Sequence, residues 1–341
     1  MHLLIVKKGA LGDVVRTSYF AKALKDRWGP ELRLSWITAP SSVDLLRLNP
    51  HVDDLWLEFA SAKPYRFDRI YSLDDEIETL EGVAALTTGA ISGAFLENGR
   101  PTYTQDTAEW FDMGLLSRFG KNRGDELKRL NQRSHAQIFA DIFEVERVTP
   151  EFHVDDACRR WACANLPPAV RRVGINPYSG GRWPSKELRP NELRRLIDRI
   201  LEGSSPFGPD TTIVLLGAAG DFTKNKNLAA ERGEPRLIAA CTDESVQHLA
   251  AAVGALDYLI TSDSLALHLG VAQGVPLTGF FSPTSAAEID DWGIATKVLS
   301  TAPDYCSYRK DADNSTISAE RIIEAIEQNP RARGHGTGRR A

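Results

Sequence analysis

The chain has little cysteine and no strong excess of either charge. Its four cysteines, spread over 341 residues, are Cys158, Cys163, Cys241 and Cys306. Their spacing fits neither a disulfide framework nor a common zinc motif, so we expect reduced thiols and no metal site. The net charge of −5 lacks the basic excess that is typical of nucleic-acid-binding domains. We therefore expect no nucleic-acid partner.

Long apolar runs are also missing. The first apolar run, Leu3–Val6, is only four residues long, whereas the core of a signal peptide needs about 7–15 apolar residues. No other run approaches the roughly 20 apolar residues that cross a bilayer. We expect a cytoplasmic protein that contacts the inner membrane at most peripherally.

The length of the chain and its repeating pattern indicate two α/β domains. A chain of 341 residues exceeds the usual size of one hydrophobic core. Short apolar runs alternate with helically spaced segments in both halves, which is typical of doubly wound parallel sheets. We expect domains over residues 1–165 and 170–328, a linker at Pro167-Pro168 and a disordered Gly/Arg-rich tail over 329–341. Glycines interrupt the pattern between residues 76 and 132, where we expect irregular structure.

A glycine-containing turn, residues 9–13, follows the first predicted strand and ends at Asp13. Asp13 either caps a helix that begins at Val14 or acts as a general base that faces a cleft between the domains. A helix N-terminus favours the charged form of an aspartate, so such a base would depend on its positioning. Lys7 and Arg16 either bind an anionic acceptor or are merely solvated.

In the second half, residues 176–186 follow the first predicted strand. Gly180 and Gly181 allow backbone amides to approach an anion closely, and Lys186 supplies a positive charge for a phosphate. The alternative is an ordinary turn with an exposed lysine. The segment matches neither the P-loop spacing nor the dinucleotide-binding glycine pattern.

A second polar segment follows the strand near residues 258–260. Asp263 and Ser264 lie at the expected start of a helix, where backbone amides and the helix dipole favour a diphosphate. His268 lies four residues after Ser264, on the same helix face, and either binds the ligand or is structural. Asp221 follows another strand, and either accepts from ribose hydroxyls or caps a helix from Phe222.

Six basic residues gather in the glycine-containing stretch of the first half. They form either a solvated face or a surface for an anionic acceptor or a lipid. They are Arg118, Lys121, Arg123, Lys128, Arg129 and Arg133.

Taken in order, these segments resemble glycosyltransferase family 9, the heptosyltransferases of bacterial lipopolysaccharide core assembly. The resemblance covers roughly residues 3–327. The matching segments are 4–14, 67–70, 175–186, 263–268 and 279–284.

This resemblance implies a GT-B architecture, in which two Rossmann-like domains face each other across a cleft. The first domain would bind the acceptor and the second a nucleotide-sugar donor, without an obligatory metal or other cofactor. Asp13 would deprotonate the acceptor hydroxyl, and Lys186 would neutralise the leaving diphosphate. Asp263, Ser264 and His268 would hold the donor. The implied reaction is an inverting transfer of heptose from ADP-heptose to an anionic glycan or glycolipid, such as the lipopolysaccharide inner core.

Two other functions stay open at this stage. A GT-B nucleotide-sugar epimerase or hydrolase would act on the donor without an acceptor, and a non-catalytic subunit would only bind the nucleotide-sugar. The basic residues of the first half favour transfer to an anionic acceptor. The combination of Asp13 with Lys186 favours catalysis, because a pure binding protein needs no base.

Overall fold

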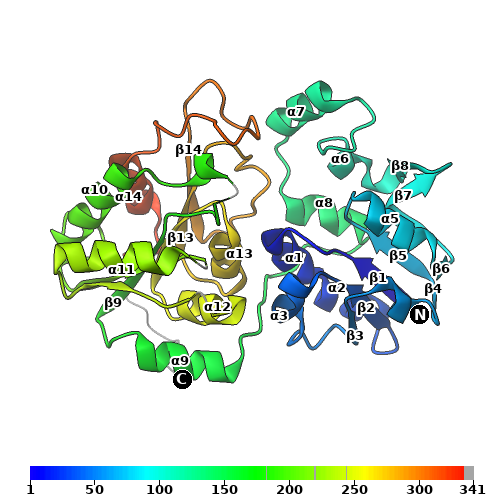
Figure 1. Ribbon diagram of the computed structural model, residues 1–341, viewed down its shortest axis with the longest axis horizontal. Coiled ribbons are helices and arrows are strands. Elements are labelled where there is room, and N and C mark those ends of the chain that lie inside the picture. The colour runs from blue at the N-terminus through cyan, green and yellow to red at the C-terminus, as the bar shows by residue number, and fades with distance from the viewer. Residues whose placement is uncertain (182, 219, 243, 334–341) are drawn as a thin grey trace. The chain divides into compact units, whose positions relative to one another are not determined.

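The computed structural model describes residues 1–181, 183–218, 220–242 and 244–333 (Figure 1). They form two compact units. The first unit comprises Met1–Thr149 and Ala287–Asp290, and the second comprises Pro150–Ala286 and the chain from Asp291 onward. Each unit contains a six-stranded sheet. None of the helices in the described part of the chain is long and apolar enough to cross a bilayer.

The sheet of the first unit has the strand order β3-β2-β1-β5-β7-β8, and only the β7–β8 pair is antiparallel. A separate small parallel sheet pairs β4 with β6. The central strand β1 is apolar at four successive positions, all fully buried, because helices cover both of its faces. The strands are β1 (His2–Val6), β2 (Arg33–Ile37), β3 (Asp54–Trp56), β4 (Arg66–Phe67), β5 (Arg69–Ser72), β6 (Thr87–Thr88), β7 (Ile91–Glu97) and β8 (Arg100–Tyr103).

The helices of the first unit cover both faces of this sheet. Leu4 and Val6 of β1 join an apolar cluster with α4 and α5, whereas Tyr71 of β5 packs against Phe143 and hence against α2 and α8. The helices are α1 (Leu11–Ser18), α2 (Phe20–Trp28), α3 (Val43–Leu46), α4 (Phe59–Ala62), α5 (Ile77–Ala84), α6 (Ala108–Phe111), α7 (Lys121–Leu130) and α8 (His135–Ile142), with short 3-10 turns η1 (Pro40–Ser42) and η2 (Gln105–Thr107).

The sheet of the second unit is parallel throughout, in the order β11-β10-β9-β12-β13-β14. Its strands are β9 (Arg171–Asn176), β10 (Thr211–Leu215), β11 (Leu237–Ala239), β12 (Tyr258–Ser262), β13 (Leu277–Phe281) and β14 (Ala295–Leu299). Its helices are α9 (Asp156–Asn165), α10 (Pro190–Leu201), α11 (Asp221–Arg232), α12 (Val246–Gly254), α13 (Leu265–Ala272) and α14 (Ala319–Gln328), with the 3-10 turn η3 (Pro184–Lys186).

Helices cover both faces of the second sheet as well. Val173 and Ile175 of β9 share an apolar core with α10 and α14. On the other face, α13 approaches the strands at Gly270, where a Cβ would lie only 2.9 Å from a methyl carbon of Leu259. The predicted α/β class with doubly wound sheets is therefore confirmed.

Both sheets share one strand order, which is 3-2-1-4-5-6 when the sheet strands are numbered within each unit. In such a sheet the chain reverses its direction of progress between the first and the fourth strand. These are β1 and β5 in the first unit, and β9 and β12 in the second. Ligands of open α/β sheets bind at the carboxyl ends of the strands at this reversal.

The stretch between residues 76 and 132 is not irregular, as its glycines had suggested, because it contains α5, β7, β8 and α7. Gly93 lies inside β7 with φ of +120°, and a Cβ there would lie 1.9 Å from the carbonyl oxygen of Ser72. This glycine permits close approach of two strands instead of ending one.

The ends of the units also differ from the expected boundaries. Helix α9 belongs to the second unit, which begins at Pro150. The start of the expected disordered tail is packed, because Asn329 and Ala332 are buried. The Asn329 amide donates to the Tyr258 hydroxyl at 3.1 Å and to the Leu277 carbonyl at 3.2 Å. The rest of that tail, residues 334–341, lies outside the described residues.

Candidate functional site

The first unit carries a charged cluster at its strand reversal. Lys7 follows β1, and Asp74 follows the neighbouring strand β5, so the sheet brings together two residues that are 67 positions apart. The Lys7 Nζ lies 2.5 Å from Asp74 Oδ1, and the backbone N–H of Lys8 donates to Asp74 Oδ2 at 2.5 Å. Burial raises the pKa of the Asp74 carboxyl. Burial opposes the charge on Lys7, but Asp74 and Asp13 outweigh it and raise the pKa of Lys7.

Asp13 lies in the first turn of α1, which begins at Leu11 with Ala10 as its N-cap residue. The expectation that Asp13 caps a helix from Val14 is therefore wrong, because the preceding turn is already helical. The Asp13 carboxylate forms an ion pair with Arg16, three residues later in the same helix, and Asp13 Oδ1 lies 2.8 Å from Arg16 Nη2.

Two cations thus flank Asp13, since Lys7 Nζ lies 3.9 Å from its other oxygen. Arg16 is itself held in place by Glu288 at 3.9 Å and by the ring of Trp110, whose centroid lies 5.3 Å from the guanidinium carbon. The Asp13 side chain is 32% exposed, against 4% for Asp74. Of the two carboxylates that contact Lys7, Asp13 is therefore more accessible than Asp74 to a hydroxyl group of a bound molecule.

The three other predicted acceptor-binding residues lie in the loop before α7 and in α7 itself. Arg118, Lys121 and Arg123 are exposed, and each pairs with a carboxylate of its own neighbourhood. The partners are Asp112, Asp125 and Glu126, respectively. Lys128 and Arg129 belong to the same helix, whereas Arg133 pairs with Glu109 and Asp141.

The second unit carries a cluster at the corresponding reversal, where β9, β12 and β13 end side by side. Lys186, in η3, donates to Asp263 Oδ2 at 2.8 Å and to the Asp263 carbonyl at 3.3 Å. The hydroxyl of Thr284, which follows β13, donates to the same carboxylate oxygen at 2.6 Å. The Asp263 carboxylate therefore accepts from an ammonium and a hydroxyl at once.

The charge state of Asp263 follows from these neighbours. Burial by itself would raise the pKa of this carboxyl, but the Lys186 ammonium and His268 overcome it and lower the pKa to about 2. His268 lies on α13 and is buried. Asn176, at the end of β9, donates to the Ser264 hydroxyl at 2.9 Å, which ties the start of α13 to the neighbouring strand.

Gly180 and Gly181 form an exposed turn between β9 and Lys186. Their φ angles of +75° and +74° are ones that side chains with a Cβ rarely adopt, and no atom lies within 4 Å of a Cβ built on either residue. The turn thus leaves open space beside the backbone.

Asp221 begins α11, and Gly220 is the N-cap residue, so Asp221 does not cap a helix from Phe222 as one reading of the sequence had it. Its carboxylate accepts from the Ala218 N–H at 3.1 Å and pairs with Lys224 at 3.0 Å. It is a buried group at the start of the helix that follows β10, the strand beside β9.

Two members of these clusters were missed in the sequence. Asp74 follows β5 and Thr284 follows β13, so their position after the carboxyl end of a strand was a usable signal. What the sequence did not contain was the strand order that brings Asp74 to Lys7 and Thr284 to Asp263.

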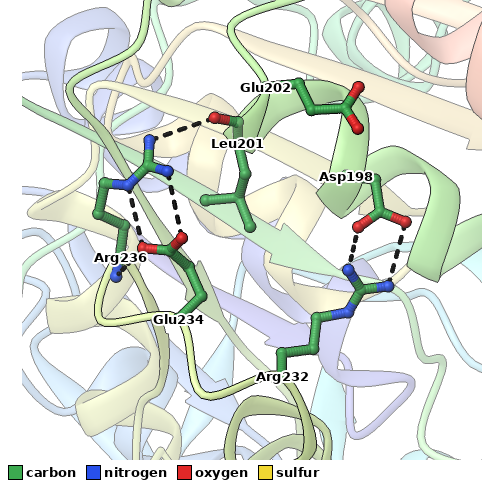
Figure 2. Close-up of a pocket in the computed structure, with 6 residues that line it drawn as sticks. All are labelled: Asp198, Leu201, Glu202, Arg232, Glu234 and Arg236. Atoms are coloured by element: carbon green, nitrogen blue, oxygen red, sulfur yellow. Dashed lines mark hydrogen bonds and ion pairs between the residues drawn. The ribbon is translucent and has the colours of Figure 1, made fainter.

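A surface pocket of the second unit lies at the end of the strands opposite to the Lys186 cluster (Figure 2). It lies between the ends of α10 and α11 and the segment before β11, so it is at the amino ends of the strands. Both of its arginines are already paired, Arg232 with Asp198 and Arg236 with Glu234 (Figure 2), and Glu202 adds a third carboxylate. The pocket is a poor candidate for a binding site, because its arginines are paired and because ligands of open α/β sheets bind at the carboxyl ends of the strands.

The described residues contain no group of three or more His, Cys, Asp or Glu side chains that is arranged to hold a metal ion.

Comparison with known proteins identifies the fold. No protein-family profile matches the chain, and no curated protein matches its sequence. A glycosyltransferase family 9 structure from Veillonella parvula matches with a TM-score of 0.72 and 18% identity over 96% of both chains. The ADP-heptose lipopolysaccharide heptosyltransferase II of E. coli matches with a TM-score of 0.65 and 15% identity over 96% of this chain and 98% of its own.

The E. coli heptosyltransferase WaaC with ADP matches with a TM-score of 0.63 and 15% identity over 98% of this chain and 99% of its own. The similarity covers nearly the whole chain in each case, whereas the identity is low. The resemblance seen in the sequence motifs thus extends to the whole fold. The chain has the GT-B fold of the family 9 glycosyltransferases.

Proposed function

We propose that this protein is an inverting glycosyltransferase that transfers a sugar from a nucleotide-sugar to a hydroxyl of a bacterial glycan or glycolipid. The observation that carries the proposal is the pair of clusters at equivalent strand reversals. One presents an accessible carboxylate, Asp13, and the other a lysine, Lys186, which follows an open glycine turn in the sequence. Inverting transfer needs a base for the acceptor and a positive charge for the leaving diphosphate.

In the proposed reaction the acceptor oxygen bonds to the anomeric carbon from the face opposite the diphosphate. The bond from that carbon to the diphosphate oxygen breaks, and the electron pair leaves with the diphosphate. The acceptor proton passes to Asp13, whose orientation is fixed by Arg16. We propose that Asp13 acts through its position, which the contacts with Arg16 and Lys7 determine.

Lys186 is proposed to stabilise the charge that develops on the diphosphate. In the structure its ammonium donates a hydrogen bond to the Asp263 carboxylate. This contact holds Lys186 at the carboxyl end of β12. We assign Asp263 to the positioning of Lys186, and Ser264, His268 and Asp221 to contacts with the rest of the donor. Lys7 and Arg16, which contact Asp13, are proposed to contact the acceptor as well.

The leading donor is ADP-heptose, and the leading acceptor is the lipopolysaccharide inner core. This choice is supported by the fold shared with E. coli heptosyltransferases, one of which is described with ADP. No metal or other cofactor is required by the proposed chemistry, because Lys186 supplies the positive charge at the leaving group.

Nucleotide binding is the first test. Isothermal titration of the purified protein with ADP, UDP, GDP and ADP-heptose should show selective binding of ADP and ADP-heptose. Selective binding of UDP would be consistent with sugar transfer, but it would replace ADP-heptose by a UDP-sugar as the proposed donor. If no nucleotide binds at millimolar concentration, the proposal fails, because ligand binding at the second cluster is its minimum requirement.

Two variants then separate binding from chemistry. Asp13→Asn should lower turnover by about 10²–10⁴-fold and leave the Kd for ADP unchanged. Asp26→Asn is its matched control, because Asp26 also pairs with a lysine on a helix of the first unit. Lys186→Gln should weaken ADP binding, whereas Lys226→Gln, on the exposed side of α11, should not. A donor that is consumed at the same rate without acceptor would favour the epimerase or hydrolase alternative.

A further inference from the structure

The loop between β14 and α14 has an unusual backbone (Figure 1). Cys306 and Tyr308 have positive φ angles, of +60° and +55°, which side chains with a Cβ rarely adopt. Five non-glycine residues in the described part of the chain have a positive φ, and two of them lie within three positions here. Such conformations persist where the surrounding structure over-determines them, and they cluster at functional sites. The contacts of residues 305–314, which we call the 305–314 loop, are therefore informative.

The backbone of the 305–314 loop pairs with the segment that follows β13. The N–H of Cys306 donates to the Ser282 carbonyl at 3.0 Å. The N–H of Tyr308 donates to the Pro283 carbonyl at 2.8 Å. The two residues with positive φ are thus the ones that bind the loop to the chain at the carboxyl end of β13, where ligands of open α/β sheets bind.

Two tyrosine hydroxyls of the loop continue this contact beyond residue 283. The Tyr308 hydroxyl oxygen accepts from the Ser285 N–H at 3.3 Å. The Tyr305 hydroxyl oxygen accepts from the Ala286 N–H at 3.1 Å. Together with the backbone bonds, these contacts anchor the chain on both sides of Thr284.

The other end of the 305–314 loop holds η3, which carries Lys186. The Ser185 hydroxyl donates to the Arg309 carbonyl at 2.9 Å. The Asn314 amide donates to the Glu187 carbonyl at 2.9 Å. Lys186 is therefore also flanked by anchored residues. One loop thus fixes both chain segments whose side chains donate to the buried carboxylate of the second cluster.

We propose that two hydroxyls of this loop, those of Tyr305 and Tyr308, position Thr284 in the second cluster. Thr284 and Lys186 donate to the same oxygen of Asp263, so the hydroxyl takes up acceptor capacity that the ammonium would otherwise use. When Thr284 is released, Asp263 holds Lys186 more firmly, and less of the positive charge is available to a phosphate. The effect on a diphosphate rests on the proposed function, whereas the positioning of Thr284 does not.

A double-mutant cycle tests this positioning, because residues that act through one contact have non-additive effects. The variants are Tyr308→Phe, Thr284→Val and their combination. The measured quantity is the Kd for ADP, from isothermal titration. Each single variant should raise this Kd by about 3–10-fold, the usual contribution of one hydrogen bond. The combined variant should bind ADP at most about twofold more weakly than Thr284→Val alone.

Urea unfolding of the same four proteins gives a second cycle that needs no nucleotide. Thr284→Val should lower the urea midpoint of the wild type, and by about half as much or less when Tyr308→Phe is already present. If the wild type binds no ADP, the proposed function fails, and this second cycle decides the positioning alone. Additive shifts of the midpoint would then overturn it.

The matched control is Tyr258→Phe. The Tyr258 hydroxyl also contacts two groups of the second unit, Thr278 at 2.8 Å and the Asn329 amide at 3.1 Å, but in its core. The control should lower the urea midpoint and leave the Kd for ADP unchanged. The proposal is overturned if the control weakens ADP binding as much as Tyr308→Phe does, since lost stability would then explain the result.

Two other outcomes also overturn the proposal. One is a Kd for ADP that Tyr308→Phe leaves unchanged while Thr284→Val raises it. The other is a combined variant whose Kd rises by the product of the two single effects. Tyr305→Phe, which removes the acceptor of the Ala286 N–H, replaces Tyr308→Phe with the same expectations if that variant does not fold.

Discussion

Replacing Asp263 by asparagine removes the carboxylate that holds Lys186 and keeps the shape of the side chain. The pKa of Asp263 falls from 3.8 to about 2 in the folded protein. At about 1.4 kcal/mol per pKa unit, the folded state favours the charged carboxylate by about 2 kcal/mol. We expect Asp263→Asn to be destabilised by about this amount at pH 7, because Lys186 then lacks its counter-ion.

The pH dependence follows from the direction of the shift. A folded pKa below the unfolded one gives stability that is fully present above pH 3.8 and is lost as pH falls towards 2. The difference in unfolding free energy between wild type and Asp263→Asn should therefore shrink between pH 4 and pH 2. Comparing the two proteins cancels the contribution of every carboxylate that they share.

Urea unfolding followed by circular dichroism, at pH 7, 4, 3 and 2.5, measures this difference. Roughly two thirds of the pH-dependent part should be lost by pH 2.5. A difference that stays constant from pH 4 to pH 2.5 would refute the reasoning, because Asp263 would then titrate alike in the folded and unfolded chain. The variant Thr284→Val, which removes only the hydroxyl donor to Asp263, should show a smaller effect of the same sign.

Two further predictions concern the framework. Gly93→Ala should destabilise the first unit by more than about 3 kcal/mol or prevent folding, because the new Cβ meets the Ser72 carbonyl oxygen. Gly99→Ala, with φ of +75° and no atom within 4 Å, should cost only about 1 kcal/mol, and thermal unfolding of the two variants compares them directly. Asn329→Ala should lower the unfolding free energy by about 1–3 kcal/mol, because buried carbonyl groups lose their donor. The variant Asn122→Ala, at an exposed position, is its control in urea unfolding. Equal stability of the two variants would contradict the stabilising role of the Asn329 hydrogen bonds.

The alternation of strands and helices was readable from the sequence because buried parallel strands are short, continuous apolar runs. The strand expected near residues 258–260 and the helix expected to start at Asp263 and Ser264, for example, agree with β12 and α13 to within a residue or two. Strand β14 was missed because its residues are mostly half-buried, so it lacks such a run. Gly93 misled the prediction because a glycine that ends a strand and one that permits a close approach look the same in a sequence.

The candidate site was predictable to the extent that its residues follow strands. Asp13, Lys186 and Asp263 were selected for this reason. Asp263 directly follows β12, whereas Asp13 lies in the first turn of α1 after β1 and Lys186 lies in η3 after β9. The partner of Lys7 was not predictable, because Asp74 is 67 residues away and only the pairing of β1 with β5 brings them together.

The hydrogen bond between Lys186 and Asp263 has a consequence for ligand exchange. Asp263 is tethered 2.8 Å from the lysine, so it acts as an internal competitor whose concentration at the ammonium never falls. If Lys186 binds the diphosphate, every donor molecule has to share the ammonium with this carboxylate, which limits how tightly the nucleotide binds. The same competition speeds departure of the spent nucleotide, because the lysine has a partner ready when the diphosphate leaves. Tighter binding and slower release would then go together in any variant that lacks the Asp263 charge.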